Sequence, residues 1–152
     1  MQPTQPAPDP RLRAFDALIG EWDLHHRDLK TGETWRGRDK FAWMEGGYFL
    51  MFHHEEFGRD IKGMMIIGFE QRWPAMQFSD AILGHWFEGS TGNHFVYFWE
   101  VDEQTVRFSF EEQDSPYRFL GQFNQDRSQI EGEWHLPDGS VYALTMTRRS
   151  AV

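Results

Sequence analysis

Histidines are the residues of this 152-residue chain best suited to chemistry, and four of the seven form two adjacent pairs, His25-His26 and His53-His54. An imidazole can transfer protons, ligate haem iron or bind a divalent metal. Adjacent side chains of a strand point to opposite faces, so each pair is expected to present one histidine to an interior. The spacing includes no His-x-His pair and no His-Glu-x-x-His helix. We therefore predict no metal site and no cofactor, although haem bound through one interior histidine stays open.

Asp80 and His85 are the candidates for catalysis. If the strand is interrupted between Ala81 and Gly84, the two side chains could meet at the mouth of a barrel. An aspartate that orients a histidine is the arrangement of a general-base pair. The commoner alternative is a β-turn, in which Asp80 accepts from backbone amides and Gly84 takes a positive φ.

Two arginines could hold the charged end of a ligand. Arg107 and Arg118 both fall in segments with strand character. Fatty-acid-binding barrels use interior arginines to pair a buried carboxylate, because an unpaired buried charge is costly. The alternative is that both arginines point outward on a polar face.

Aromatic residues are abundant, with 14 Phe and 7 Trp in an aromatic fraction of 16%. Large rings suit strands that face a narrow interior, where they either fill a core or line a pocket. Combining rings with the polar candidates predicts one ligand-binding set: Trp43, His26, His54, Phe52, His85, Trp99, Arg107 and Arg118.

The chain begins with a Pro-rich stretch, residues 1–8, which we expect to be a disordered tail. Asp9 and Pro10 then form an N-cap followed by proline at the first helical position. Apolar residues recur at helical spacing up to Gly20, a natural helix stop. A short helix is thus predicted at the start of a single domain that spans residues 9–150.

After Gly20, the chain consists of short segments with strand character, separated by turns, which is typical of an antiparallel meander. They number about ten, more than an open sheet usually holds, so closure into a barrel is predicted. If Trp22 points inward, Leu24 and His26 point inward with it. In the segment that begins at Tyr48, both faces carry apolar residues, so the pattern does not indicate which face is interior. The predicted strands are 22–27, 34–44, 48–57, 61–70, 75–79, 83–89, 94–101, 105–111, 117–123, 129–135 and 140–148.

Short motifs recur in a fixed order along the chain: Leu18-Ile-Gly-Glu-Trp22, Trp35-Arg-Gly37, Gly46-Gly-Tyr-Phe-Leu50, Met65-Ile-Ile-Gly68, Phe78-Ser-Asp80, Arg118-Phe-x-Gly121, Ile130-x-Gly-x-Trp134 and Leu144-Thr-Met-x-Arg148. In this order they resemble an uncharacterised family of bacterial lipocalin-like small barrels, a domain of unknown function in the calycin group. The resemblance implies an all-β fold, a closed antiparallel barrel with an internal cavity, and no established activity. It also implies that a late arginine, Arg148 or Arg149, packs over the ring of Trp22 at the closed end. The apolar 81–83 segment and the aromatic 94–99 segment depart from the family pattern.

Composition narrows the class of partner. The net charge of −9 argues against nucleic-acid binding and against docking on an anionic membrane. The chain has no cysteine, which suits a reducing cytosol, and its first residues lack the pattern of a signal peptide. We expect a cytoplasmic protein.

These observations favour binding of a small, largely apolar molecule in the barrel cavity. A barrel cyclase or isomerase acting on a flexible apolar substrate is the enzymatic alternative, because catalysis by positioning leaves little trace in a sequence. A partner-binding module with a filled interior is a further alternative, and a homodimer stays open.

Overall fold

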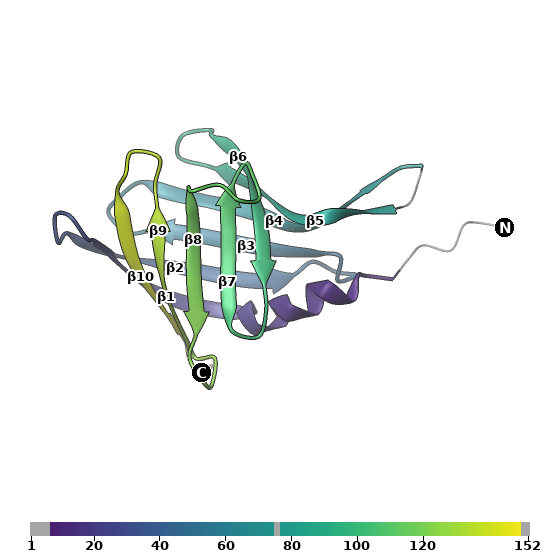
Figure 1. Ribbon diagram of the computed structural model, residues 1–152, viewed down its shortest axis with the longest axis horizontal. Helices are drawn as coiled ribbons and strands as arrows, with labels where there is room; N and C mark the ends of the chain where they lie inside the picture. The colour runs from purple at the N-terminus through teal and green to yellow at the C-terminus, as the bar shows by residue number, and fades with distance from the viewer. Residues whose placement is uncertain (1–6, 75–76, 150–152) are drawn as a thin grey trace.

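The computed structural model describes residues 7–74 and 77–149, and it confirms the predicted closed antiparallel barrel (Figure 1). The strands join in the order β1-β10-β9-β8-β7-β6-β5-β4-β3-β2, so β1 and β10 close the sheet. Every strand thus pairs with its neighbour in sequence, apart from the closing pair. The strands are β1 Gly20–Asp28, β2 Thr34–Trp43, β3 Phe49–Glu56, β4 Ile61–Arg72, β5 Gln77–Glu88, β6 His94–Val101, β7 Thr105–Phe110, β8 Arg118–Phe123, β9 Gln129–His135 and β10 Val141–Arg148.

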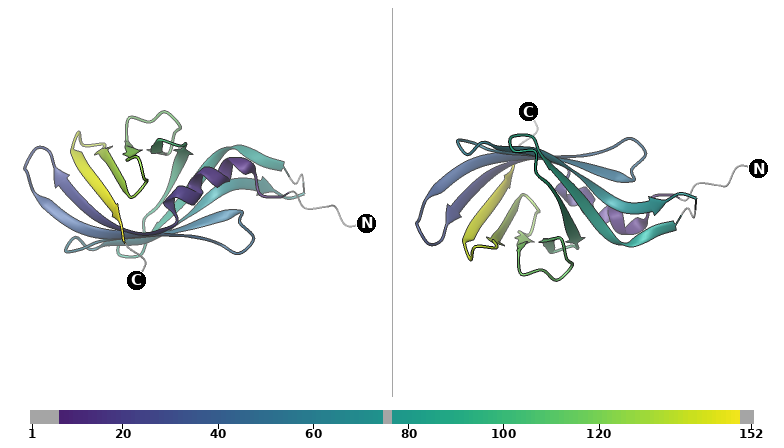
Figure 2. Two further views of the ribbon diagram at one scale, coloured as in Figure 1. Left: turned by 90° about the horizontal axis from the view of Figure 1, so that it is seen from below. Right: turned by 90° about the horizontal axis from the view of Figure 1, so that it is seen from above.

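The predicted N-terminal helix is present as the 3₁₀ helix η1, Pro10–Leu18. Its buried residues Leu12, Phe15 and Leu18 are three apart, which matches a helix of three residues per turn. Asp9 caps the helix by accepting from the backbone N–H of Arg11 at 2.9 Å. Figure 2 shows η1 between the β2–β3 hairpin and the long β4–β5 hairpin, where it covers one end of the barrel. No helix in the described ranges is long and apolar enough to cross a membrane.

Trp22 lies at the closed end that η1 covers. Its side chain is fully buried, and its indole N–H donates to the carbonyl of Leu18 at 2.8 Å. The guanidinium of Arg148 stacks 4.2 Å from the Trp22 ring and donates to the carbonyls of Ala17 and Ile19. The expected arginine over Trp22 is therefore Arg148.

Inward and outward residues alternate along the strands, as the pleat requires. In β1, Trp22, Leu24 and His26 are buried while their neighbours are exposed, which confirms the predicted face. In β3 the interior face is that of Leu50, Phe52 and His54, a choice that the sequence pattern did not make.

Strand β5 differs from the prediction of two segments, 75–79 and 83–89. Residues 75 and 76 lie outside the described ranges, and from Gln77 to Glu88 the strand is continuous. Gly84 is an interior residue of this strand and does not form a turn. A Cβ there would lie 2.4 Å from the sulfur of Met65 and 2.5 Å from the indole nitrogen of Trp99, so a close approach of side chains explains the glycine.

Candidate functional site

The barrel encloses a cavity of about 370 Å³, a volume near the lower end of the range for ligand sites, which is roughly 300–1,000 Å³. Most of its wall is aromatic or aliphatic, and the rings come from strands on both sides of the barrel. Stacked and edge-on ring pairs hold this wall in place, such as Trp99 on Phe108 with centroids 4.2 Å apart. The apolar lining comprises Leu18, Phe41, Phe52, Ile61, Met65, Trp86, Phe95, Tyr97, Trp99, Val106, Phe108, Phe119, Trp134, Leu136, Tyr142, Leu144 and Met146.

A polar cluster forms one part of the wall. Asp39 of β2 and His54 of β3 are cross-strand neighbours, with 2.6 Å between Oδ1 and Nδ1. The other ring nitrogen of His54, Nε2, lies 3.3 Å from Oε1 of Glu56, two residues further along the inner face of β3. The imidazole of His54 is thus held between two carboxylates.

His26 and Trp35 extend this cluster across β1 and β2. Their rings stack with centroids 5.0 Å apart and an interplanar angle of 3°. Both approach Glu56: the indole N–H of Trp35 donates to Oε2 at 3.0 Å, whereas Nε2 of His26 lies 3.6 Å from Oε1, beyond hydrogen-bond distance. The guanidinium of Arg59 lies 3.5 Å from the centre of the Trp35 ring and also pairs with Glu33 at 3.0 Å.

The two interior histidines have opposite electrostatic environments. Burial lowers the pKa of His26 to about 4, despite the opposing effect of Glu56, so this ring is neutral at physiological pH. Burial also acts to lower the pKa of His54, but the adjacent Asp39 and Glu56 carboxylates outweigh it and raise that pKa to about 10. The cavity wall therefore places a protonated imidazole near a neutral one, with ring centroids 6.5 Å apart.

One atom of the cluster is unsatisfied. The Nδ1 atom of His26 is buried and has no hydrogen-bond partner among the residues that the structure describes. Since His26 lines the cavity with only 2% of its surface exposed, the wall retains hydrogen-bonding capacity beside its apolar rings.

Four members of the predicted ligand-binding set line this cavity: His26, Phe52, His54 and Trp99. Trp43 lies on the inner face of β2 but outside the cavity lining, because its indole N–H donates to Asp16 of η1 at 2.8 Å and Arg13 covers its ring. Trp43 thus joins the helix to the barrel.

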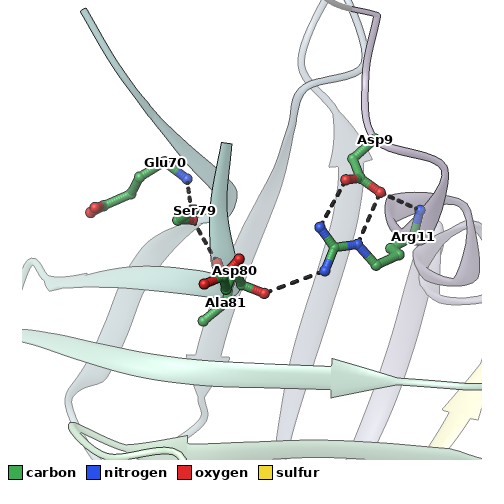
Figure 3. A network of polar contacts seen from close by, with 6 residues as sticks. All are labelled: Asp9, Arg11, Glu70, Ser79, Asp80 and Ala81. Atoms are coloured by element: carbon green, nitrogen blue, oxygen red, sulfur yellow. Dashed lines mark hydrogen bonds and ion pairs between the residues drawn. The ribbon is translucent and has the colours of Figure 1, made fainter. Parts of the chain in front are cut away.

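Asp80 and His85 are not brought together. They are five residues apart on β5, and the pairing of β5 with β4 is irregular between them, since Phe69 is opposite Ile82 and Gln71 is opposite Phe78. His85 is on the outside, 3.4 Å from Glu70. Asp80 lies near the start of η1, where its backbone carbonyl accepts from Arg11 at 3.4 Å (Figure 3). The contacts of these two residues are thus with Glu70 and Arg11, and they do not form the expected general-base pair.

Arg107 and Arg118 also lie outside the cavity. The inward residues of β7 and β8 are Val106, Phe108 and Phe119, so the intervening arginines point outward. Arg107 lies 3.5 Å from Asp114 in the following loop. The expectation of an interior arginine paired with a ligand carboxylate is not met by either residue.

Asp39 and Glu56 were missing from the predicted set although alternation could have indicated both. Asp39 shares the parity of Trp35 and Phe41, and Glu56 shares that of Phe52 and His54. Acidic side chains are expected to face solvent, because buried carboxylates are rare unless they are paired. The pairing depends on strand register, which no local pattern specifies.

Comparisons with known proteins identify no relative by sequence: no family model matches, and no curated protein matches. The chain is similar to a de novo designed fluorescence-activating β-barrel, with 14% identity, 90% of this chain and 97% of that chain covered, and a TM-score of 0.45. It is also similar to a redesigned β-barrel, with 17% identity, 91% and 96% covered, and a TM-score of 0.42. Within the described residues, no group of three or more His, Asp or Glu side chains could hold a metal ion.

Proposed function

We propose that this protein binds a small, largely apolar and uncharged molecule in the barrel cavity, with a hydroxyl or carbonyl group at the polar cluster. The observation that carries the proposal is the composition of the wall, in which one compact group of polar side chains and the separate carboxylate of Glu88 interrupt a largely apolar lining. Apolar walls with a few placed polar groups are typical of small-molecule sites, since the rings provide affinity and the polar groups fix orientation.

The charges at the cluster favour a neutral ligand over a carboxylate. The cations of the wall are already paired, His54 with Asp39 and Glu56, and Arg59 with Glu33. A ligand carboxylate would enter beside Asp39 and Glu56, both acidic, without a free cation to offset its desolvation. A neutral group avoids this cost and can still exchange hydrogen bonds with the cluster.

The test compares decan-1-ol with decanoate, which share a chain and differ in the charge of the polar end. Binding is followed through intrinsic tryptophan fluorescence, because Trp86, Trp99 and Trp134 line the cavity. The measurement uses the Trp73→Phe background, which removes an indole that is 85% exposed. We expect the alcohol to bind at least tenfold more tightly than the carboxylate at neutral pH. Tighter binding of decanoate would overturn the charge argument.

A matched pair of variants locates the site. Leu144→Phe enlarges a side chain of the cavity wall, whereas Thr145→Phe enlarges its neighbour on the outer face of β10. We expect Leu144→Phe to weaken decan-1-ol binding at least tenfold and Thr145→Phe to leave it within about twofold. Equal effects of the two variants, or no binding of either probe by the wild type, would contradict the proposal.

The Asp39–His54 pair also favours a second candidate, proton transfer on a bound ketone. His54 is protonated and can donate to a carbonyl oxygen through Nε2 in place of Glu56, while the neutral His26 removes a proton from the adjacent carbon. With a β,γ-unsaturated ketone, the dienol formed in this way would be reprotonated at the γ-carbon, which moves the double bond into conjugation and completes an isomerisation. The readout is deuterium incorporation into decan-2-one in heavy water, expected with the wild type and absent from His26→Phe. Equal incorporation with both proteins and with buffer would exclude this candidate.

A further inference from the structure

The outer face of strands β3 to β6 is apolar at its centre, with charged residues such as Glu55, Lys62, Glu70 and Glu100 toward its ends, which is unusual for the solvent side of an antiparallel barrel. Side chains on this side of the sheet are placed by alternation with the cavity-lining residues of the same strands. Most are half-buried by their cross-strand neighbours, and Phe87 is 49% exposed. We call these residues the β3–β6 face: Phe49, Met51, Met64, Ile66, Leu83, Phe87, Val96 and Phe98, with His53, His85 and His94 among them.

The neighbouring strands β1 and β2, which continue the sheet beyond β3, have a different character. The outward residues of β1 and β2 are largely charged or polar, as expected of a surface that faces water. They include Asp23, His25, Arg27, Arg36, Arg38 and Lys40. The apolar side chains are therefore concentrated on one side of the molecule, which distinguishes an interaction surface from isolated exposed residues.

The size of the β3–β6 face fits the core of an interface. Four strands spaced by about 4.8 Å give a width of roughly 19 Å, and the outer side chains from Lys62 to Glu70 cover about 27 Å along β4. This area, on the order of 500 Å² in projection, is the central part of the roughly 800 Å² that each partner contributes to a standard interface. The surrounding loops and charged residues would form the rim.

The charges at the ends of this face are self-complementary. Ile66 lies at the centre of β4, paired with Met51 on one side and His85 on the other. Lys62 and Glu70 are each four residues from Ile66, in opposite directions. On the same outer face, Glu55 of β3 is the cross-strand neighbour of Lys62, and His85 of β5 lies 3.4 Å from Glu70. If two copies pack through this face about a two-fold axis that crosses β4 at Ile66, Lys62 of one copy faces Glu70 of the other.

We propose that the β3–β6 face binds a second copy of this chain in an isologous dimer centred on Ile66. Each copy buries its apolar rows against the same rows of the other, and two Lys62–Glu70 contacts flank the axis. The cavity is on the other side of the sheet, so the dimer leaves the ligand site intact and the two proposals can fail separately.

The experiment is sedimentation velocity of the full chain over a concentration series from micromolar to sub-millimolar. We expect wild type to reach the mass of two chains. Ile66→Glu and Phe87→Lys should each be monomeric at every concentration, with an unchanged near-ultraviolet circular dichroism spectrum that shows a folded barrel. Leu120→Glu is the matched control, because Leu120 is an exposed apolar residue of β8, 44% exposed, outside this face. It should dimerise like wild type.

Charge reversal tests the two-fold arrangement. Lys62→Glu and Glu70→Lys should each weaken dimerisation by roughly tenfold, because each puts like charges together at two symmetric contacts. The double variant should recover the wild-type dissociation constant. A wild-type chain that stays monomeric throughout, a dimer that survives Ile66→Glu and Phe87→Lys, or a double variant weaker than both single ones would each overturn the proposal.

Discussion

Asp39 and His54 face each other across β2 and β3, with 2.6 Å between carboxylate and imidazole inside a largely apolar barrel. Both side chains are buried enough that neither has water as its main partner, with 6% and 16% of their surfaces exposed. Burial raises the pKa of Asp39, and the adjacent His54 opposes that rise. Each group thus offsets the cost of burying the other in the cavity wall.

Replacing Asp39 by asparagine should lower the free energy of unfolding by about 3 kcal/mol, because it leaves the His54 charge buried with one carboxylate instead of two. Urea denaturation measures the change. The control is Asp23→Asn, which removes a half-exposed pair with Arg38 at 3.6 Å and should cost less than about 1 kcal/mol. Similar losses in the two variants would show that the buried pair has no special role.

Stability should depend on pH on both sides of about 6.5, the ordinary pKa of histidine. On the alkaline side, His54 binds its proton more tightly in the folded state, with its pKa raised to about 10. The stabilisation from this proton is complete below pH 6.5 and is lost as the pH rises toward 10. Urea denaturation between pH 6.5 and 10 should show a steady decrease in the free energy of unfolding, reduced in Asp39→Asn.

On the acid side the controlling residue is His26, whose pKa burial lowers to about 4. Between pH 6.5 and 4 the unfolded chain binds the proton more readily than the folded protein, so stability falls as the pH falls. His26→Phe keeps a ring against Trp35 and removes the titration, which should flatten this part of the curve. His25→Phe, on the outer face of β1, is the control and should retain the wild-type slope.

Arg148→Lys should destabilise the closed end of the barrel by about 2 kcal/mol. The planar guanidinium of Arg148 stacks on Trp22 and at the same time donates to the carbonyls of Ala17 and Ile19. The ammonium of lysine has no planar group and cannot make both contacts. Thermal unfolding and loss of the near-ultraviolet signal of Trp22 are the measurements. Arg149→Lys alters the neighbouring exposed arginine and should have little effect. An Arg148→Lys variant as stable as Arg149→Lys would contradict this role.

Gly132→Ala should destabilise the barrel by about 2 kcal/mol, within the range for overpacking. A Cβ at this position would lie 2.4 Å from the carbonyl oxygen of Leu120 and 2.7 Å from the Cα of Gly121. Both are backbone atoms of β8, so the strands would have to separate. At Gly89 the nearest atom would be 3.5 Å away, and Gly89→Ala should change stability by less than about 0.5 kcal/mol. Chemical denaturation of both variants compares them directly.

Local signals in the sequence were sufficient for the architecture. The Asp9-Pro10 cap and the helical spacing of the apolar residues after it predicted the helix. The alternation of side chains along a strand predicted that Leu24 and His26 share the face of Trp22. These features depend on near neighbours in the chain, through capping and through the pleat of a strand. They can therefore be predicted from the sequence without knowledge of the fold.

The site depended on the tertiary structure. Asp39 and His54 are fifteen residues apart and meet only because the register of β2 against β3 makes them cross-strand partners. Strand pairing also determined that Arg107 and Arg118 lie outside the cavity and that Asp80 and His85 have different partners, Arg11 and Glu70. A shift of one residue in register would exchange every inner and outer side chain of a strand. The sequence by itself thus determined a barrel with aromatic walls and a capped end, while strand register decided which polar groups share its cavity.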